Sequence, residues 1–481
     1  MSLILIILVP LFTAGAAALL GNWPNLRESV SLLGGLALFI LNLSLLPAVL
    51  AGGFPAVWIA EPIPGLSIAF QAEPLGVLFG LTASFLWLVT TVYSIGYLRS
   101  HGESHQSRFF AFFAVAIAST MGVAFAENLF TLFIFYELLT FSTYPLVTHT
   151  GTVEARQAGR KYLGILVGTS MAFLLVAVVW TWLLAGTVDF RVGGILAGTA
   201  SPVVIGLLYA LFVFGIGKAA LMPFHRWLPA AMVAPTPVSA LLHAVAVVKV
   251  GVFAILKVTI YVFGLDLVRS SGASNWLLWI AGGTILIASL IALQQDNLKR
   301  RLAYSTISHL SYIVLGGLLA NAAGIIGGAM HIATHAFGKI TLFFCAGAIL
   351  VTTHKTRISE MGGLGRTMPL TMGAFLLASL SIAGLPPMGG LWSKWYLALG
   401  TLDAGHSVLL GILMLSTLLN VAYLLPIPIR AFFGKAAGAP VTGYREAPVP
   451  CLLAIGITTA VCLILFFVPQ PFYRLAELLI N

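Results

Sequence analysis

Apolar runs of roughly 20 residues recur along the whole chain, and they restrict its fold more than any other feature. Each run is long enough to cross the ~30 Å hydrocarbon core of a bilayer as an α-helix. Only 8% of the 481 residues are charged, against about 25% in soluble domains. We therefore expect an all-α polytopic membrane protein without a soluble domain.

The apolar runs predict about fourteen membrane-spanning helices. Proline and glycine interrupt the seventh, eighth and twelfth with "LMPFHRWLP", "VKVGVF" and "AGLPPMGG". Such breaks occur at membrane depth where protein or water satisfies the freed backbone groups. The predicted spans are 2–21, 29–50, 74–96, 109–126, 128–149, 158–184, 203–233, 237–265, 275–294, 299–320, 323–351, 368–401, 406–433 and 449–469.

The basic residues gather on one side of this predicted topology. Loops after odd-numbered helices hold 16 of the 24 lysines and arginines, the opposite side holds 3, and 5 lie inside helices. The positive-inside rule then predicts that both termini lie on the extracytoplasmic side of the cell (inner or plasma) membrane. The net charge of +10 is thus explained by topology, and we expect no nucleic-acid partner.

Buried basic residues occur in two similar arrangements along the chain. Helices four to eight and helices nine to thirteen each combine a His/Lys helix with a lysine near a broken helix. Five helices in each unit give the units opposite topologies, and inverted repeats with broken helices are typical of transporters. We predict four parts: 1–107 with three helices, 108–265 and 266–433 as inverted five-helix repeats, and 434–481 with the last helix.

Glu137, in "FIFYELLTFSTYPLV", is the one acid clearly in the middle of a predicted span. An ionised carboxylate in such a setting costs several kcal/mol or more unless it is paired. Lys218, in "FGIGKAALMPF", is the first candidate partner, because opposite charges within about 4–6 Å keep each other ionised. We predict that Glu137 and Lys218 approach within reach of a hydrogen bond or one water, as a switchable pair suited to proton transfer.

Other titratable residues extend from this pair along the later helices. Ser305, His309 and Tyr312 share one helix face by spacing, as do His331, His335 and Lys339. His243 and Lys249 do not, unless a local break near Gly251 realigns them. The predicted proton-transfer residues are Glu137, Lys218, Lys249, His243, His309, His335, Lys339 and Lys394.

Less specific roles compete with this interpretation. His243 and His331 are equally well explained as structural hydrogen-bond donors, and Lys257, near a helix end, as a side chain that reaches the interface. Glu127, at a helix start, suits the helix dipole. The HxxxH spacing of His331 and His335 has no nearby carboxylate, so no metal site is expected, and no motif for a nucleotide, flavin, iron–sulfur or other cofactor occurs.

Five segments together carry a family resemblance. "FYELLTFSTYPLV", "GIGKAALMPFHRWLPAAMVAPTPVSALLHAVAVVKVGVF", "DNLKRRLAYSTISHLSYI", "HIATHAFGKITLFFCAGAI" and "GLPPMGGLWSKWYL" resemble the antiporter-like subunits. That family includes the A-type and D-type subunits of Mrp cation/proton antiporters, the L-, M- and N-type subunits of respiratory complex I, and relatives in membrane-bound hydrogenases. The resemblance implies that Glu137 pairs with Lys218, that Lys249 or His243 continues the path, and that Lys394 ends it.

The resemblance also implies partners and a subtype. Lys394 at the twelfth-helix break is similar to D- and L-type members, and about fourteen helices is too short for the L-type or the A-type. We expect the D-type (MrpD-like) subunit of a monovalent cation (Na⁺)/H⁺ antiporter, working with other membrane subunits in the bilayer. The alternatives are a proton-pumping subunit of an NADH:quinone oxidoreductase or hydrogenase, the membrane subunit of an inorganic-carbon uptake complex, and a structural anchor without an ion path.

Overall fold

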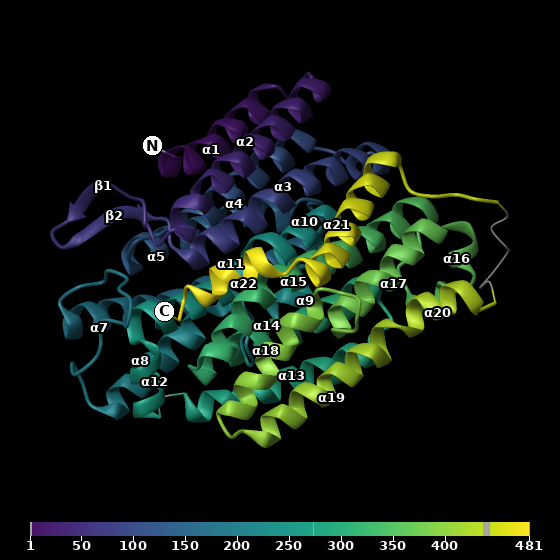
Figure 1. The fold of residues 1–481 in the computed structure, drawn as a ribbon. Coiled ribbons are helices and arrows are strands. Elements are labelled where there is room, and N and C mark those ends of the chain that lie inside the picture. The colour runs from purple at the N-terminus through teal and green to yellow at the C-terminus, as the bar shows by residue number, and fades with distance from the viewer. Residues whose placement is uncertain (1, 273, 436–442, 481) are drawn as a thin grey trace.

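A computed structural model describes residues 2–272, 274–435 and 443–480, and these form a bundle of helices with one β-hairpin (Figure 1). The first part comprises α1 (Ser2–Leu19), α2 (Pro24–Leu50), β1 (Ala56–Ile63), β2 (Leu66–Gln71), α3 (Pro74–His101), α4 (Gln106–Ala124) and α5 (Leu129–Val147). The middle comprises α6 (Val153–Thr169), η1 (Ser170–Leu174), α7 (Leu175–Ala185), α8 (Pro202–Gly215), η2 (Gly217–Ala219), α9 (Trp227–Ala230), η3 (Ala231–Val233), α10 (Thr236–Ala240), η4 (Leu241–Val245), α11 (Val247–Val258), η5 (Thr259–Phe263) and α12 (Leu265–Ser271). The last part comprises α13 (Asn275–Gln294), α14 (Leu298–Leu319), α15 (Ala322–Thr353), η6 (Ile358–Glu360), α16 (Leu364–Thr367), α17 (Pro369–Ala383), α18 (Gly390–Asp403), α19 (Ser407–Leu424), α20 (Pro426–Phe433), α21 (Val449–Phe467) and α22 (Gln470–Glu477).

The predicted membrane helices are present. In the described part of the chain, twelve helical segments are long and apolar enough to cross a membrane, and α8 and α17 are shorter apolar helices. Local signals set their ends: proline occupies the first turn of α3, and the side chains of Asn128 and Asn321 accept hydrogen bonds from the first-turn amides of α5 and α15. The polytopic helical class is therefore confirmed, whereas the two inverted repeats and the four-part division stay predictions.

The seventh and twelfth spans are broken where the sequence predicts. α8 ends at Gly215, a short 3₁₀ turn carries Lys218, and helix resumes only at Trp227. α17 ends at Ala383, Gly384 closes it with φ of 78°, and α18 starts at Gly390. Glycine suits position 384 because a side chain at positive φ would be strained.

The break in the eighth span lies earlier than expected. A π-helical turn covers Leu241–Val245, and Ala246 departs from helical geometry with φ of −111° and ψ of −86°. Gly251 instead lies inside the regular helix α11. A Cβ at Gly251 would collide with the backbone of Lys218 and Ala219, so this glycine permits close packing of η2 on α11 and creates no break.

The β-hairpin between α2 and α3 was not predicted. β1 and β2 are antiparallel, with Ala56 opposite Gln71 and Val57 opposite Phe70, and Gly65 adopts φ of 81° in the turn. The amide of Gln71 donates to the carbonyl oxygen of Phe125 at 2.7 Å, which attaches the hairpin to the end of α4. We call the end of the bundle that carries this hairpin the hairpin side.

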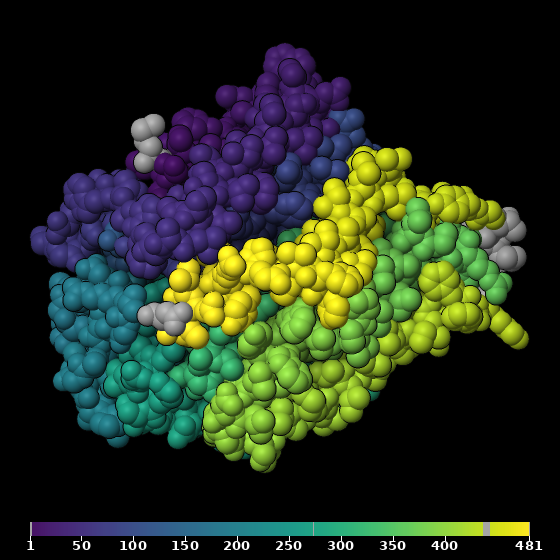
Figure 2. Space-filling view, in the orientation of Figure 1, coloured from purple at the N-terminus to yellow at the C-terminus, as the bar shows by residue number. Residues whose placement is uncertain are grey.

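The long helix α15 forms the centre of the molecule. It packs against α14, α17, α18, α21 and α3, and nearly all of its residues are buried. The C-terminal helices α21 and α22 lie across α15 and α3 at the surface, as the yellow band in Figure 2 shows. Polar residues on α15 are therefore far from solvent, and this burial determines their chemistry.

Candidate functional site: a buried chain of lysines and histidines

Glu137 lies on α5 with its carboxylate inside the protein. The residue is 7% exposed, and neither carboxylate oxygen has a hydrogen-bond partner among the described residues. Leu138 and Phe141, close to it on the same helix, are 39% and 54% exposed. The acid is thus buried close to an outward-facing surface of α5.

Lys218 is fully buried in the break of the seventh span. Its ammonium donates to the Tyr136 carbonyl oxygen at 2.8 Å and to Thr140 Oγ1 at 2.6 Å, and it lies 3.1 Å from the centre of the Tyr136 ring. Both partners are near neighbours of Glu137 on α5. No direct hydrogen bond or ion pair joins Lys218 to Glu137 among the described residues, so of the two predicted kinds of contact the direct one is not made. The α5 carbonyl and hydroxyl hold the ammonium instead, and contact through one water stays a prediction.

Lys249 of α11 meets His335 of α15 directly. Lys249 Nζ and His335 Nδ1 are 2.6 Å apart, and both residues are buried. The spacing of His331, His335 and Lys339 predicted that they share one face of their helix, and the structure turns that face toward α11 and α14. A lysine–histidine hydrogen bond lets a proton move between two groups without leaving the protein interior.

Three histidine rings continue from this contact. His309 Nδ1 lies 3.0 Å from His331 Nε2, and the rings of His309 and His335 are 5.1 Å apart, centre to centre. His331 Nδ1 then lies 2.8 Å from Ser393 Oγ on α18. The sequence did not distinguish a functional from a structural role for His331, and it did not single out Ser393. The structure places both residues among the hydrogen-bonded bases.

Lys339 and Lys394 flank the histidines. Lys339 donates to Ser305 Oγ at 2.5 Å. Lys394 donates to the carbonyl oxygen of Ala383 at 3.0 Å, at the break of the twelfth span, and lies 5.3 Å from the centre of the Tyr312 ring. The Tyr312 ring stacks on His309 with ring centres 5.1 Å apart, and the two residues share the helix face that their spacing predicted.

His243 is close to these hydrogen-bonded lysines and histidines but is not bonded to any of them. Its ring lies 4.7 Å from that of Phe343, and neither ring nitrogen has a partner among the described residues. His309 Nε2 and His335 Nε2 are in the same condition. Buried polar groups are nearly always hydrogen-bonded to protein or to ordered water, so these atoms mark where we expect water to extend the chain.

A buried ion pair lies nearer the hairpin side. Lys257 Nζ is 3.1 Å from Glu73 Oε1, and both side chains are buried. The structure gives Lys257 a charged partner, Glu73 at the start of α3, which the interpretation of Lys257 as a side chain reaching the interface did not include. Glu73 is also the N-cap of α3, where its carboxylate accepts hydrogen bonds from the amides of Leu75 and Gly76.

No metal site emerges at the histidines. The described residues contain no group of three or more His, Cys, Asp or Glu side chains placed to hold a metal ion. The hydrogen bonds of His331 go to His309 and Ser393. The assembled groups are instead hydrogen-bonded bases that suit stepwise proton transfer.

Comparison with known proteins identifies the family. The family model described as NADH:quinone oxidoreductase/Mrp antiporter, TM matches residues 126–420, a range that includes both Glu137 and Lys394. The protein belongs to this family of antiporter-like membrane proteins. A relative named NADH-quinone oxidoreductase subunit N, from Desulforudis audaxviator, is 36% identical over 93% of this chain and 89% of its own length.

Other relatives are longer or match in fold alone. Subunit L of NADH-quinone oxidoreductase from Mycobacterium tuberculosis is 31% identical over 83% of this chain and 63% of its own. A chain in the structure of the Mrp complex from Dietzia sp. has a TM-score of 0.88 at 23% identity, covering 100% of this chain and 96% of that one. A chain of an archaeal membrane-bound sulfane sulfur reductase has a TM-score of 0.87 at 24% identity, covering 99% of this chain and 96% of its own. These two structures share the fold.

Proposed function

We propose that this protein is a proton-translocating subunit of a multisubunit membrane complex, and that protons move along the buried lysines and histidines. The observation that carries the proposal is the contact of Lys249 with His335 and of His309 with His331, which joins α11, α14 and α15 in the interior. A packed apolar core has no need of such groups, and burying them costs free energy. Their assembly is explained by transfer of charge through the protein.

Glu137 and Lys218 form the first step of the proposed path. Lys218 is held by neighbours of Glu137 on α5, so a small movement of the broken segment that bears Lys218 changes its distance from the carboxylate. An acid nearby favours the charged ammonium, and separation favours the neutral amine. Movement at the break is thereby coupled to uptake and release of a proton.

The complex that contains this chain has two main candidates. The 36% identity to an N-type subunit of NADH-quinone oxidoreductase along most of both chains favours a redox-driven complex, whose redox chemistry lies in partner subunits. A lysine at the twelfth-helix break and the fold shared with a chain of the Mrp complex support the expected D-type subunit of a Na⁺/H⁺ antiporter. Subunits that copurify from native membranes, identified by mass, distinguish the two, and an inorganic-carbon uptake complex is a third outcome.

Neutral substitution of the first pair tests the proposed function. In everted vesicles, Lys218→Ala and Glu137→Gln should reduce proton transport by about 100-fold, the scale expected for loss of a proton-transfer group. Lys161→Ala is the matched control, because Lys161 is exposed on α6, and it should leave transport unchanged. Full transport by both core variants at normal expression would instead favour a structural anchor.

A further inference from the structure

Lys257 is the one lysine of the five inside predicted spans that has no place in the proposed path, yet it lies on the same helix as Lys249. Lys249, Phe253 and Lys257 follow one another at four-residue intervals on α11 and therefore lie along one stripe, and the backbone rises by about 12 Å along the helix axis from the first lysine to the second. Phe253 is one turn from each lysine. The helix thus places one aromatic ring between the central chain and a second charged group.

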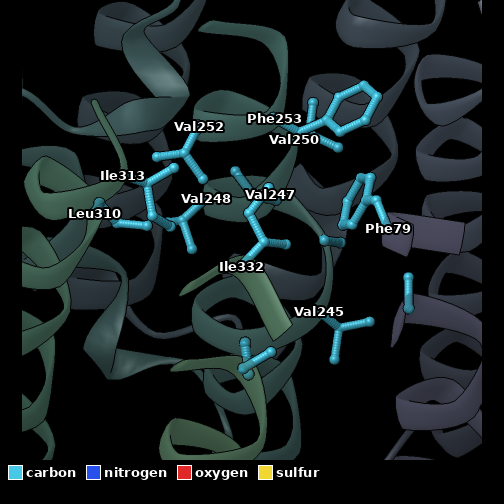
Figure 3. Packing of buried hydrophobic residues seen from close by; sticks show 14 of the residues in the cluster. Phe79, Val245, Val247, Val248, Val250, Val252, Phe253, Leu310, Ile313 and Ile332 are labelled. Atoms are coloured by element: carbon cyan, nitrogen blue, oxygen red, sulfur yellow. The ribbon is translucent and has the colours of Figure 1, made fainter. Parts of the chain in front are cut away.

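Phe253 is buried and packs against apolar side chains. The Phe253 ring packs against Phe79 of α3 with ring centres 5.0 Å apart, and both residues are buried. Val250 lies next to Phe253, and other buried valines of α11 lie in the same part of the interior, as Figure 3 shows. A constriction lined only by such side chains excludes water and so interrupts a proton path.

On the other side of Phe253, Lys257 is held as an ion pair. Its ammonium contacts Glu73 Oε1 at 3.1 Å and donates to the Ala124 carbonyl oxygen at 3.3 Å, and it lies 5.5 Å from the Phe253 ring centre. Tyr261, one turn further along the chain, donates to Glu73 Oε2 at 3.1 Å. Glu127 is the other charged group that interacts electrostatically with Lys257.

The ion pair borders a small cavity that reaches the surface. The cavity has a volume of about 30 Å³ and is lined by Glu73, Lys257 and Tyr261 together with Phe54 and Val192. Phe54 and Val192 are 44% and 73% exposed. The volume is enough for a water molecule, and Lys257, itself buried, borders this cavity on the hairpin side. Burial, together with the charge of Asp189, raises the pKa of Glu127 beside it, whereas the charge of Lys257 opposes that rise.

We propose that Lys257 and Glu73 form a proton exchange point with the aqueous phase on the hairpin side, and that Phe253 and Phe79 gate it from Lys249. With the gate closed, the Lys257 ammonium gives its proton to water in the cavity and becomes a neutral amine. When the rings separate and water enters, the Lys249 ammonium passes one proton through that water to the Lys257 amine. In each cycle Lys257 receives one proton from Lys249 and releases one to the cavity water. The reverse order of steps takes up a proton from the hairpin side.

This inference rests on the proposed function, and its test uses the complex purified with all its subunits. The complex is reconstituted in liposomes, and a K⁺ diffusion potential, negative inside, drives protons inward. A pH-sensitive dye reports the proton flux. Lys257→Arg keeps the charge and the ion pair with Glu73, but a guanidinium releases its proton far less readily than an ammonium. Flux should therefore fall at least about tenfold in a complex that is otherwise intact.

The gate is tested by Phe253→Ala, with Phe113→Ala as the control for an aromatic deletion elsewhere in the core. Phe253→Ala should raise passive flux, and adding Lys257→Arg should remove the increase. A merely structural Lys257 predicts that the leak persists in the double variant. If Lys257→Arg prevents assembly, the comparison of Phe253→Ala with Phe113→Ala decides alone.

Two results would overturn the inference: normal flux with Lys257→Arg, or equal flux in Phe253→Ala and Phe113→Ala. Failure of the proposed function looks different, because the wild-type complex would then carry no more protons than Lys218→Ala. Wild-type flux that depends on Lys218 but ignores Lys257 rejects the exchange point and leaves the proposed function in place.

Discussion

Single hydrogen bonds between distant helices join the buried bases of this protein. His331 contacts His309 through one ring nitrogen and Ser393 through the other, so it connects α14 with the broken twelfth span. Ser393 also lies 3.0 Å from Thr334 of α15. A buried hydroxyl with several partners fixes the orientation of a histidine ring, and this orientation decides which nitrogen carries the proton.

Removing the Ser393 hydroxyl tests this orientation. Ser393→Ala should slow proton transport about fivefold, because a hydrogen bond contributes about 1 kcal/mol. Ser379→Ala is the control, since the Ser379 hydroxyl bonds only to a carbonyl oxygen of its own helix, at 2.7 Å from Phe375 O. Equal rates in the two variants, measured as vesicle acidification, would show that the Ser393 contact has no part in transport.

Broken helices place charged residues inside the bundle. In η2 the chain leaves α8 and brings Lys218 against α5, and at the end of α17 the freed Ala383 carbonyl oxygen accepts a hydrogen bond from Lys394. Backbone groups that a regular helix would satisfy thus become partners for ammonium groups. Packing of η2 on α11 requires Gly251, and so couples the seventh span to the eighth.

Gly251→Ala should be destabilising. Its new Cβ would lie 2.8 Å from Ala219 Cα and closer still to the backbone of Lys218, an overpacking that costs about 1–3 kcal/mol of unfolding free energy. Displacement of η2 should lower proton transport as well.

Gly283→Ala provides the comparison on α13, where an added Cβ meets nothing within 4 Å. It should leave stability unchanged or raise it by up to about 1 kcal/mol, because alanine favours helix over glycine. Unfolding of both variants in mixed detergent and denaturant gives the two free energies. Equal stability would contradict the proposed tight packing of η2 on α11.

The complete bundle has two opposite ends, and the charged features of the molecule are divided between them. The hairpin and the Glu73–Lys257 pair lie toward one end, whereas the predicted topology puts most basic loops at the other. In this predicted topology the lysines and arginines of the loops orient the protein in the membrane. Both termini and the hairpin are predicted to be extracytoplasmic.

Cysteine labelling of intact cells tests this orientation. Glu61→Cys, in the exposed hairpin, should react with a membrane-impermeant thiol reagent, and Glu154→Cys, exposed at the start of α6, should react only after the membrane is opened. The native cysteines Cys345, Cys451 and Cys462 are buried, which keeps the background low. The opposite labelling pattern would invert the predicted topology and exchange the sides that the proton path connects.

Helix positions, two of the helix breaks and the buried lysines were predictable from the sequence, because length, hydropathy and proline or glycine content are local properties. The spacing of His331, His335 and Lys339 likewise predicted a shared face. The partners were not predictable in this way: Lys218 bonds to α5 backbone and hydroxyl groups, and Lys257 pairs with Glu73. These contacts join segments that are far apart in the sequence, so they depend on how the helices pack. Helix packing also decides that His331 is hydrogen-bonded to another histidine, whereas His243 is not.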